Sequence, residues 1–151
     1  MSQAPKERPQ PPPLVDAELV PFLERAPIAR LATHNPDGST HLAPVWFKYI
    51  DGHILIPTQE KTRKSQNILR NPDVSVLIDT QEPPYIGVLI YGEGVLDYDD
   101  IFEKKLDIYR KYFPEDKLPD PYKLAEKFAP IVLRIIPKRF VTFNDQRDYG
   151  I

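Results

Sequence analysis

Hydrophobic and polar positions alternate with a period of two through the first half of the chain, which predicts β-strands. Three alternating segments cover residues 28–33, 40–50 and 53–58. The first two are separated by the sequence NPDG at residues 35–38, and the last two by Asp51-Gly52. Both sequences are typical of tight turns between paired strands. We therefore predict three consecutive antiparallel strands joined by hairpin turns.

The second half of the chain adds further strands. Residues 74–79 (VSVLID) are apolar and β-branched, and residues 85–97 form a long strand pattern that contains three glycines. Glycines within a strand indicate bends or bulges of the kind that a curved barrel needs. The segments APIVLRIIP and RFVTFN predict two closing strands on either side of Pro137. The total is about six or seven antiparallel strands, which favours a β-barrel.

Four further segments have the spacing of amphipathic helices. We expect Asp99 to cap the third of them, because aspartate accepts hydrogen bonds from the first turn of a helix. The fold class is thus mainly β (α+β), an antiparallel barrel with flanking helices. The predicted helices run from Val15 to Ala26, from Thr62 to Arg70, from Asp99 to Tyr112 and from Tyr122 to Phe128.

The N-terminal residues differ in composition from the rest. Five of the 18 prolines fall within the first 13 residues, so residues 1–14 are predicted to form a polyproline-like arm and residues 15–151 a single domain. The arm is either a linker or a strap that lies over a neighbouring subunit, and the sequence leaves both open.

Composition narrows the classes of function. The 151 residues carry a net charge of −2, which argues against a general binder of nucleic acids or anionic membranes. There is no cysteine, so disulfide scaffolds, thiolate metal sites and cysteine nucleophiles are excluded. No apolar run reaches the roughly 18 to 20 residues of a membrane span, and the first residues lack the apolar centre of a signal peptide. We expect a cytoplasmic protein that binds neither membranes nor nucleic acids.

A cluster of cations marks the start of the second predicted helix. Lys61, Arg63 and Lys64 surround Thr62 at a helix N-terminus that already carries a partial positive charge. Cations are unfavourable there unless an anion is bound, and free backbone N–H groups together with charged side chains are well suited to phosphate. The pattern predicts a phosphate site. The alternative interpretation is a solvated basic turn whose side chains point away.

A second candidate element is the strand that precedes the Asp51-Gly52 turn. Pairing through this turn is expected to place the segment from Pro44 to Lys48 beside Pro57 and Thr58. A planar ring could lie along that edge, and Lys48 could offset negative charge that develops on a flavin during reduction. The alternative for Trp46 and Phe47 is barrel core or a dimer interface, which is the usual role of aromatic residues in strands.

These segments together resemble a known family. The order RLAT, NPDGSTHLAPVWF, DGHILIPT, KTRKSQNILRNPDVSVLID and EPPYIGVLIYGEGVL is similar to the pyridoxamine 5′-phosphate oxidase-like family of split-barrel flavin proteins. The resemblance covers about Phe22 to Phe143. Its most specific feature is a threonine at a strand end, followed five residues later by Arg-Lys, a helix and Asn-Pro.

The resemblance implies an FMN-binding split barrel with defined cofactor contacts. Arg63 and Lys64 would hold the cofactor phosphate with help from Thr62, and Asn67 is a further member of the site. The ring and its sugar-like chain would contact Pro44, Val45, Trp46, Phe47, Lys48, Pro57 and Thr58. Family members are homodimers with two cofactor sites at the interface, so Tyr85, Ile86 or the last strand is expected to complete the site of the partner.

The chain also departs from the oxidase pattern. Ala43 stands where the oxidase has arginine, and the C-terminus FVTFNDQRDYGI lacks the tryptophan-containing, arginine-rich ending of the oxidase. Vitamin B6 oxidation is therefore not expected. The chain is more similar to the branch that includes enzymes using the deazaflavin F420 as well as FMN. FMN is the predicted cofactor and F420 the alternative, in which case Lys61 and Arg70 could contact its glutamyl tail.

Other chemistry has little support in the sequence. His34, His41 and His53 are scattered and lack carboxylates at metal-ligand spacing, and no hydrolase, P-loop or Rossmann motif is present. Our hypothesis is an oxidoreductase that transfers a hydride between its cofactor and a small conjugated or aromatic substrate. The alternatives are a non-catalytic flavin or haem carrier on the same barrel and, less favoured, a small barrel that binds oligonucleotides.

Overall fold

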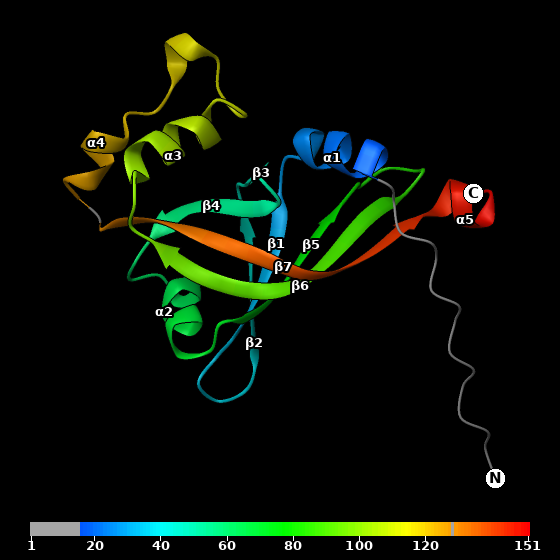
Figure 1. Ribbon diagram of the computed structural model, residues 1–151, viewed down its shortest axis with the longest axis horizontal. Helices are drawn as coiled ribbons and strands as arrows, with labels where there is room; N and C mark the ends of the chain where they lie inside the picture. Colours follow the sequence, from blue (N-terminus) through cyan, green and yellow to red (C-terminus); the bar gives the residue numbers. More distant parts are fainter. Residues whose placement is uncertain (1–15, 128) are drawn as a thin grey trace.

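A computed structural model describes residues 16–127 and 129–151, and the predicted arm at residues 1–14 lies outside them. Its centre is a seven-stranded sheet in which every pair of neighbours is antiparallel, with the order β2-β1-β5-β6-β7-β4-β3 (Figure 1). The strand count agrees with the sequence pattern. The strands are β1 (Ala29–His34), β2 (Thr40–Val45), β3 (Lys48–Ile50), β4 (His53–Gln59), β5 (Asp73–Asp79), β6 (Ile86–Asp97) and β7 (Pro130–Asn144).

The strand predicted for residues 40–50 is two strands, which corrects the sequence interpretation. β2 and β3 lie at opposite edges of the sheet although only Trp46 and Phe47 separate them in the chain, so the sheet must curl until its edges approach. The backbone of Phe47 leaves the ladder because it bonds to side chains: its N–H donates to the Tyr112 hydroxyl at 2.9 Å, and its carbonyl accepts from Lys111 Nζ at 3.1 Å.

The two closing strands predicted around Pro137 are one continuous strand, β7. β7 pairs with β6 along almost its whole length, with a register shift at Tyr91/Gly92. Proline has no N–H for the ladder, and an irregularity in the pairing accommodates it. Pro137 lies opposite Gly92 at this shift, so the ladder bends there without ending.

The interior of the curled sheet is the main hydrophobic core. Its inward-facing side chains are aliphatic except for the phenylalanines, which matches the alternation seen in the sequence. Helix α1 (Asp16–Arg25) closes one end of the core with Leu19, Phe22 and Leu23, and Pro21 lies within this helix. The largest fully buried side chains include Phe47, Leu23, Leu31, Ile54, Ile56, Ile78, Ile90, Ile131, Leu133 and Ile135.

The remaining helices lie outside the sheet. Helix α2 (Arg63–Arg70) lies on one side of the curled sheet, and α3 (Ile101–Tyr109) and α4 (Pro121–Ala125) lie together on the other (Figure 1). A short 3-10 turn, η1 (Glu115–Lys117), precedes α4, and α5 (Asp145–Tyr149) ends the fold. No helix within the described residues is long and apolar enough to cross a bilayer.

Two predicted helix boundaries need correction. The third helix begins at Ile101, and its N-cap is Asp100 in a left-handed conformation (φ 49°), without a side-chain cap bond. The prediction that Asp99 caps this helix is therefore wrong. The fourth begins at Pro121, with the Asp120 carboxylate accepting from the backbone N–H of Tyr122 at 2.9 Å.

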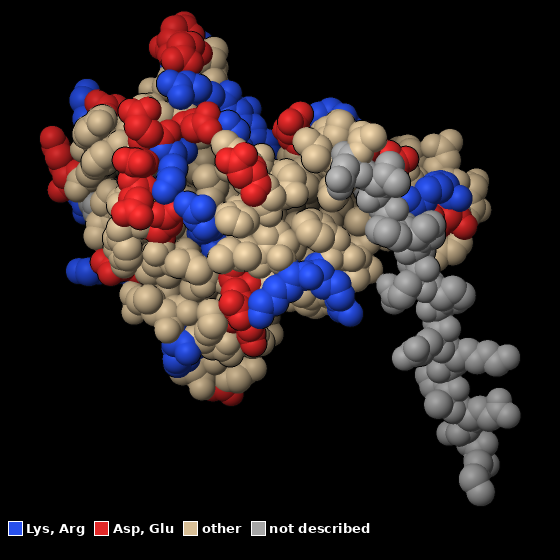
Figure 2. Space-filling model, in the orientation of Figure 1, with Lys and Arg blue, Asp and Glu red and all other residues tan. Residues whose placement is uncertain are grey.

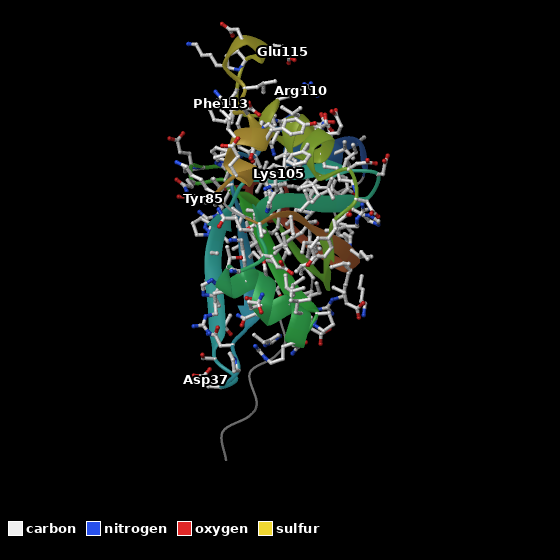
Figure 3. The ribbon with its side chains drawn as sticks, turned by 90° about the vertical axis from the view of Figure 1, so that its left-hand side faces the viewer. Asp37, Tyr85, Lys105, Arg110, Phe113 and Glu115 are labelled. Carbon is white, nitrogen blue, oxygen red and sulfur yellow. The ribbon has the colours of Figure 1, made fainter. Side chains whose placement is uncertain are left out.

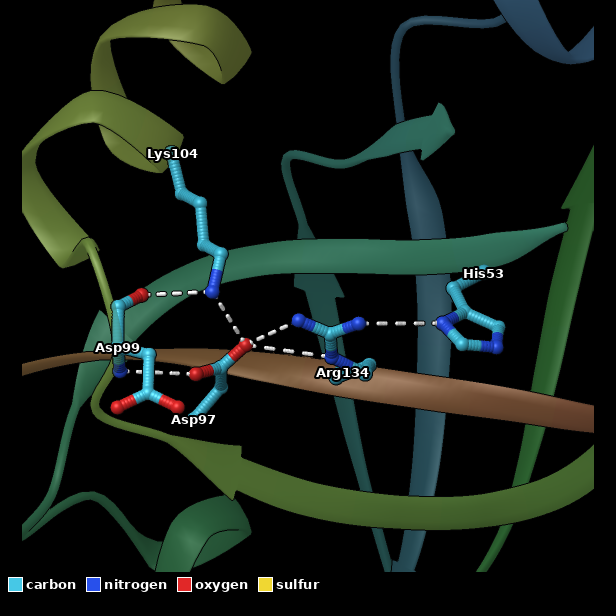
Figure 4. A network of polar contacts seen from close by, with 5 residues as sticks. All are labelled: His53, Asp97, Asp99, Lys104 and Arg134. Atoms are coloured by element: carbon cyan, nitrogen blue, oxygen red, sulfur yellow. Dashed lines mark hydrogen bonds and ion pairs between the residues drawn. The ribbon is translucent and has the colours of Figure 1, made fainter. Parts of the chain in front are cut away.

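The start of α3 is fixed to the sheet by a polar network around Asp97 (Figure 4). The Asp97 carboxylate accepts from the backbone N–H of Asp99 at 2.9 Å and pairs with Lys104 at 2.8 Å and with Arg134. Burial alone would raise the pKa of Asp97, but the bonds from Lys104 and Arg134 outweigh it and lower the pKa to about 2. The network therefore holds α3 over the end of β4 and β7.

Candidate functional site

Helix α2 begins at Arg63, one residue after the start at Thr62 that the sequence predicts. Thr62 is the N-cap, with its hydroxyl oxygen 3.4 Å from the backbone N–H of Ser65. The hydroxyls of Thr62 and Ser65 both donate to the carbonyl of Gln59, at 3.1 Å and 2.7 Å, which ties the helix start to the end of β4. The first turn contains no acidic residue, so no side chain of that turn offsets the partial positive charge of the helix end.

The two cations of this turn differ in environment. Arg63 is exposed and lines an open hollow of about 400 Å³ with four residues of the β1–β2 hairpin, Asn35, Pro36, Asp37 and His41. Lys64 is half-buried, and burial lowers the pKa of its ammonium. Neither cation forms an ion pair within the described residues. Asp37 brings one negative charge to the hollow near Arg63, and a bound anion would supply the further charge that these groups lack.

Asn67 faces the interior rather than this hollow. Its side chain is fully buried, and its amide N–H₂ group donates to Thr33 and Asn35, both at 3.0 Å. Its amide oxygen accepts from Arg70 at 3.2 Å. The structure thus gives Asn67 a clear role in packing α2 on β1, and its assignment to the cofactor site stays a prediction.

A second cavity, of about 200 Å³, lies on the other side of the sheet beneath α3 and α4. It brings together Trp46, Pro57 and Thr58, as the sequence leads us to expect. Pro44 and Val45 lie elsewhere, because β2 pairs with β1 and places them opposite Arg30 and Ala29. The expected placement of this whole segment beside Pro57 and Thr58 is therefore correct only for Trp46.

The remaining residues of the predicted ring-binding segment have other partners. Phe47 is fully buried in the barrel core, which fits the alternative interpretation for that residue. Trp46 is stacked on Tyr112 at 4.9 Å between ring centres and meets Tyr109 edge-on at 6.2 Å. Lys48 forms an ion pair with Asp107 at 2.7 Å, and its partner across the strands is Leu55.

Sequence reasoning did not identify the α3 residues that line this cavity. Lys105 and Tyr109 both face it, and Lys105 Nζ donates to the carbonyl of Thr58 at 2.9 Å. Lys105 is only 6% exposed. The available signal was its position between Phe102 and Tyr109, because a residue three places after one and four before the other lies on the apolar face of the helix.

Comparison with known proteins identifies the family. The sequence model described as pyridoxamine 5′-phosphate oxidase matches residues 15–139. The chain belongs to the pyridoxamine 5′-phosphate oxidase family. This confirms the resemblance read from the sequence and the predicted split barrel. A comparison with curated proteins gave no match.

Several solved structures share the fold of this family member. Rv2991 of Mycobacterium tuberculosis, a conserved hypothetical protein, is 24% identical with a TM-score of 0.78, over 91% of this chain and 89% of that one. An F420 reductase is 25% identical with a TM-score of 0.63, over 80% and 93%. HutZ, the haem storage protein of Vibrio cholerae, is 14% identical with a TM-score of 0.66, over 85% and 93%. The same barrel therefore occurs in proteins with different ligands.

The described residues contain two candidate binding regions. They contain no group of three or more histidine or carboxylate side chains that could hold a metal ion. They do contain a basic helix start beside an open hollow, and a separate aromatic cavity that holds a lysine. Figure 3 shows Asp37 at the tip of the β1–β2 hairpin and Lys105 beneath the helices at the other end. Gln59 joins the two regions, because it lines the cavity and its carbonyl accepts from Thr62 and Ser65 at the start of α2.

Proposed function

We propose that this protein binds FMN, or alternatively F420, and acts as an oxidoreductase on a small conjugated or aromatic substrate. The observation that carries the proposal is the unpaired cationic start of α2, where Arg63 and the half-buried Lys64 follow the Thr62 cap. Membership of the pyridoxamine 5′-phosphate oxidase family supports it. When bound, such a cofactor supplies a ring that accepts or donates a hydride.

The chain's own residues would bind and orient this cofactor. Arg63 and Lys64 would pair with its phosphate, and the backbone N–H groups of the first turn of α2 would donate to the same oxygens. Thr58, at the end of β4, would border the ring side of the site, and it also lines the cavity beneath α3 and α4. We further propose that a second copy of the chain completes the site, with Tyr85 or Ile86 facing the partner.

The first test is the visible absorption spectrum of the purified full-length protein, followed by titration with FMN and with F420. We expect a flavin or deazaflavin band, or saturable binding of one of the two cofactors. A protein that is colourless and binds neither would contradict the proposal. A haem spectrum, or reduction of a bound flavin by a nicotinamide cofactor without turnover of any acceptor, would favour the carrier alternative.

The second test locates the phosphate. The double variant Arg63→Ala/Lys64→Ala removes two charge-assisted contacts, so cofactor affinity should fall by about 3 kcal/mol, which is a hundredfold or more. Lys123→Ala/Lys127→Ala removes the same charge from exposed positions around α4 and serves as the matched control. Equal affinities for the two double variants would place the phosphate elsewhere.

A further inference from the structure

The cavity beneath α3 and α4 contains a charge that the cofactor proposal does not use. Its lining is mostly aromatic or apolar: Trp46, Pro57, Tyr109, Leu124 and Pro130, with the polar residues Thr58, Gln59 and Lys105. Lys105 comes from the buried face of α3 and is the only charged residue of this lining. Figure 3 places it between the helices and β4, whereas Arg110 and Glu115 lie farther out.

Lys105 is buried without a counter-ion. Its one hydrogen-bond partner among the described residues is the carbonyl of Thr58, although an ammonium has three N–H donors. No carboxylate of the described residues pairs with it, and the neighbouring Lys104 pairs with Asp97 instead. Burial lowers the pKa of Lys105 to about 8. A charged group in this position is costly unless an anion joins it.

The size and walls of the cavity limit what could join it. A cavity of about 150 Å³ is enough to bind benzene, so 200 Å³ admits one substituted ring. Trp46 and Tyr109 meet edge-on at 6.2 Å and offer aromatic surface to such a ring. A single ammonium balances a single negative charge, whereas phosphate sites combine several donors.

We propose that this cavity binds a small planar carboxylate whose charged group pairs with Lys105 Nζ and whose ring packs against Trp46 and Tyr109. The contact with Thr58 links the cavity to the predicted cofactor edge, because Thr58 belongs to both. We identify this carboxylate with the conjugated or aromatic substrate, and that identification alone rests on the proposed function. The carboxylate site itself depends on residues that this chain supplies without a cofactor.

The test uses the only tryptophan of the chain. Trp46 lines the cavity, so its indole N–H gives a single NMR resonance that reports occupancy. Benzoate and its neutral analogue benzamide are titrated into the full-length protein. We expect saturable shifts of the resonance with benzoate, and an affinity for benzamide that is weaker by about tenfold or more, because the charge-assisted bond is lost. Equal affinity for the two compounds, or no shift, would overturn the inference.

Variants assign the effect to the lysine. Lys105→Met should weaken benzoate about tenfold and leave benzamide unchanged. Lys123→Met, an exposed lysine outside the cavity lining, removes the same charge and should change neither. Undiminished benzoate binding by a folded Lys105→Met protein would contradict the assignment. If that variant does not fold, the comparison of benzoate with benzamide on the unaltered protein still tests whether the site prefers a carboxylate.

The pH dependence gives an independent readout. Tyr109 is the other titratable group that lines the cavity, and burial raises its pKa, so it stays neutral while Lys105 titrates. Benzoate affinity should therefore fall as pH rises above about 8, and should be flat over this range in Lys105→Met. A pH-independent affinity in the unaltered protein would contradict the role of Lys105.

Cofactor binding is recorded on the same samples from the visible spectrum. Binding of benzoate through Lys105 without binding of FMN or F420 would support the carboxylate site and contradict the proposed function. Binding of cofactor through Arg63 and Lys64 without a preference for benzoate over benzamide would support the proposed function and contradict the carboxylate site. The two proposals can thus fail separately.

Discussion

At the scale of single residues, Asn67 shows how a buried polar group joins two elements. All of its amide groups have partners: the nitrogen bonds to Thr33 and Asn35, and the oxygen accepts from Arg70. Arg70 also donates to the carbonyl of His34. A buried polar group is stable only when its hydrogen bonds are made, so this network fixes α2 on β1 in one orientation.

Replacing Asn67 should therefore cost stability. We expect Asn67→Ala to lower the free energy of unfolding by about 1–3 kcal/mol, because Thr33 and Arg70 each lose a bond at a buried site. Urea unfolding of the cofactor-free protein measures this. Gln66→Ala, at an exposed position of the same helix, is the control, with an expected change within about 0.5 kcal/mol because its one bond, to the Glu60 carbonyl, is exposed to solvent. Equal losses for the two variants would contradict the structural role of Asn67.

At the scale of elements, the position of α3 depends on contacts at both of its ends. The Asp97 network holds its start, and the segment after its last turn is held to the barrel by Lys111, which donates to the carbonyls of Leu23 at 3.2 Å and Phe47 at 3.1 Å. The Lys111 ammonium also lies 3.6 Å from the centre of the Phe47 ring. These contacts position Lys105 over the end of β4.

The Asp97 network predicts acid sensitivity. The pKa of Asp97 is about 2 in the folded protein and 3.8 in its ordinary state, so the folded form binds this proton less readily. Its contribution to stability is complete above about pH 4 and is lost as pH falls toward 2. The free energy of unfolding should therefore fall more steeply over this range in the unaltered protein than in Asp97→Asn.

Asp99→Asn provides the matched control, because Asp99 is exposed and its side chain has no partner within the described residues. Its pH profile should follow that of the unaltered protein. At neutral pH, Asp97→Asn should be less stable by about 3 kcal/mol or less, since Lys104 and Arg134 are partly exposed to solvent. Parallel profiles for Asp97→Asn and the unaltered protein would contradict the role of the network.

At the scale of the whole molecule, the outer face of the β6–β7 ladder remains partly apolar. Tyr91, Val95 and Ile136 are 36%, 45% and 37% exposed, and across the β6–β7 ladder they lie opposite the charged residues Arg139, Arg134 and Glu93. Figure 2 shows charged groups crowded at the end covered by α3 and α4, with a largely uncharged area toward α5.

We predict that the protein is a homodimer in solution, as the family resemblance implies. Light scattering of the full-length protein should give twice the chain mass of 17.5 kDa. If a second copy completes the cofactor site, the dimer should also be favoured when cofactor is added, because a ligand stabilises the state that binds it. A measured mass equal to that of a single chain at all concentrations, with cofactor bound, would contradict this prediction.

Local patterns determined the features of this protein that depend on neighbours in the chain. The β1–β2 turn, the β3–β4 turn and helix α2 follow from alternation, turn residues and helical spacing, all of which act over a few residues. The cations at the start of α2 were recognisable for the same reason. The family and its barrel could likewise be recognised, because the order of these motifs is itself a property of the sequence.

Only the tertiary structure decided which distant residues meet. The break at Trp46 and Phe47 depends on Lys111 and Tyr112, more than 60 residues later, and no local pattern predicts it. Lys105 joined Trp46 and Thr58 in one cavity because the Asp97 network orients α3. The sequence shows an asparagine at position 67 whether it binds a cofactor or packs inward. Its burial against β1 follows from the packing of α2. Such contacts arise from the folding of the whole chain, since burial and charge pairing are properties of the assembled core rather than of any segment.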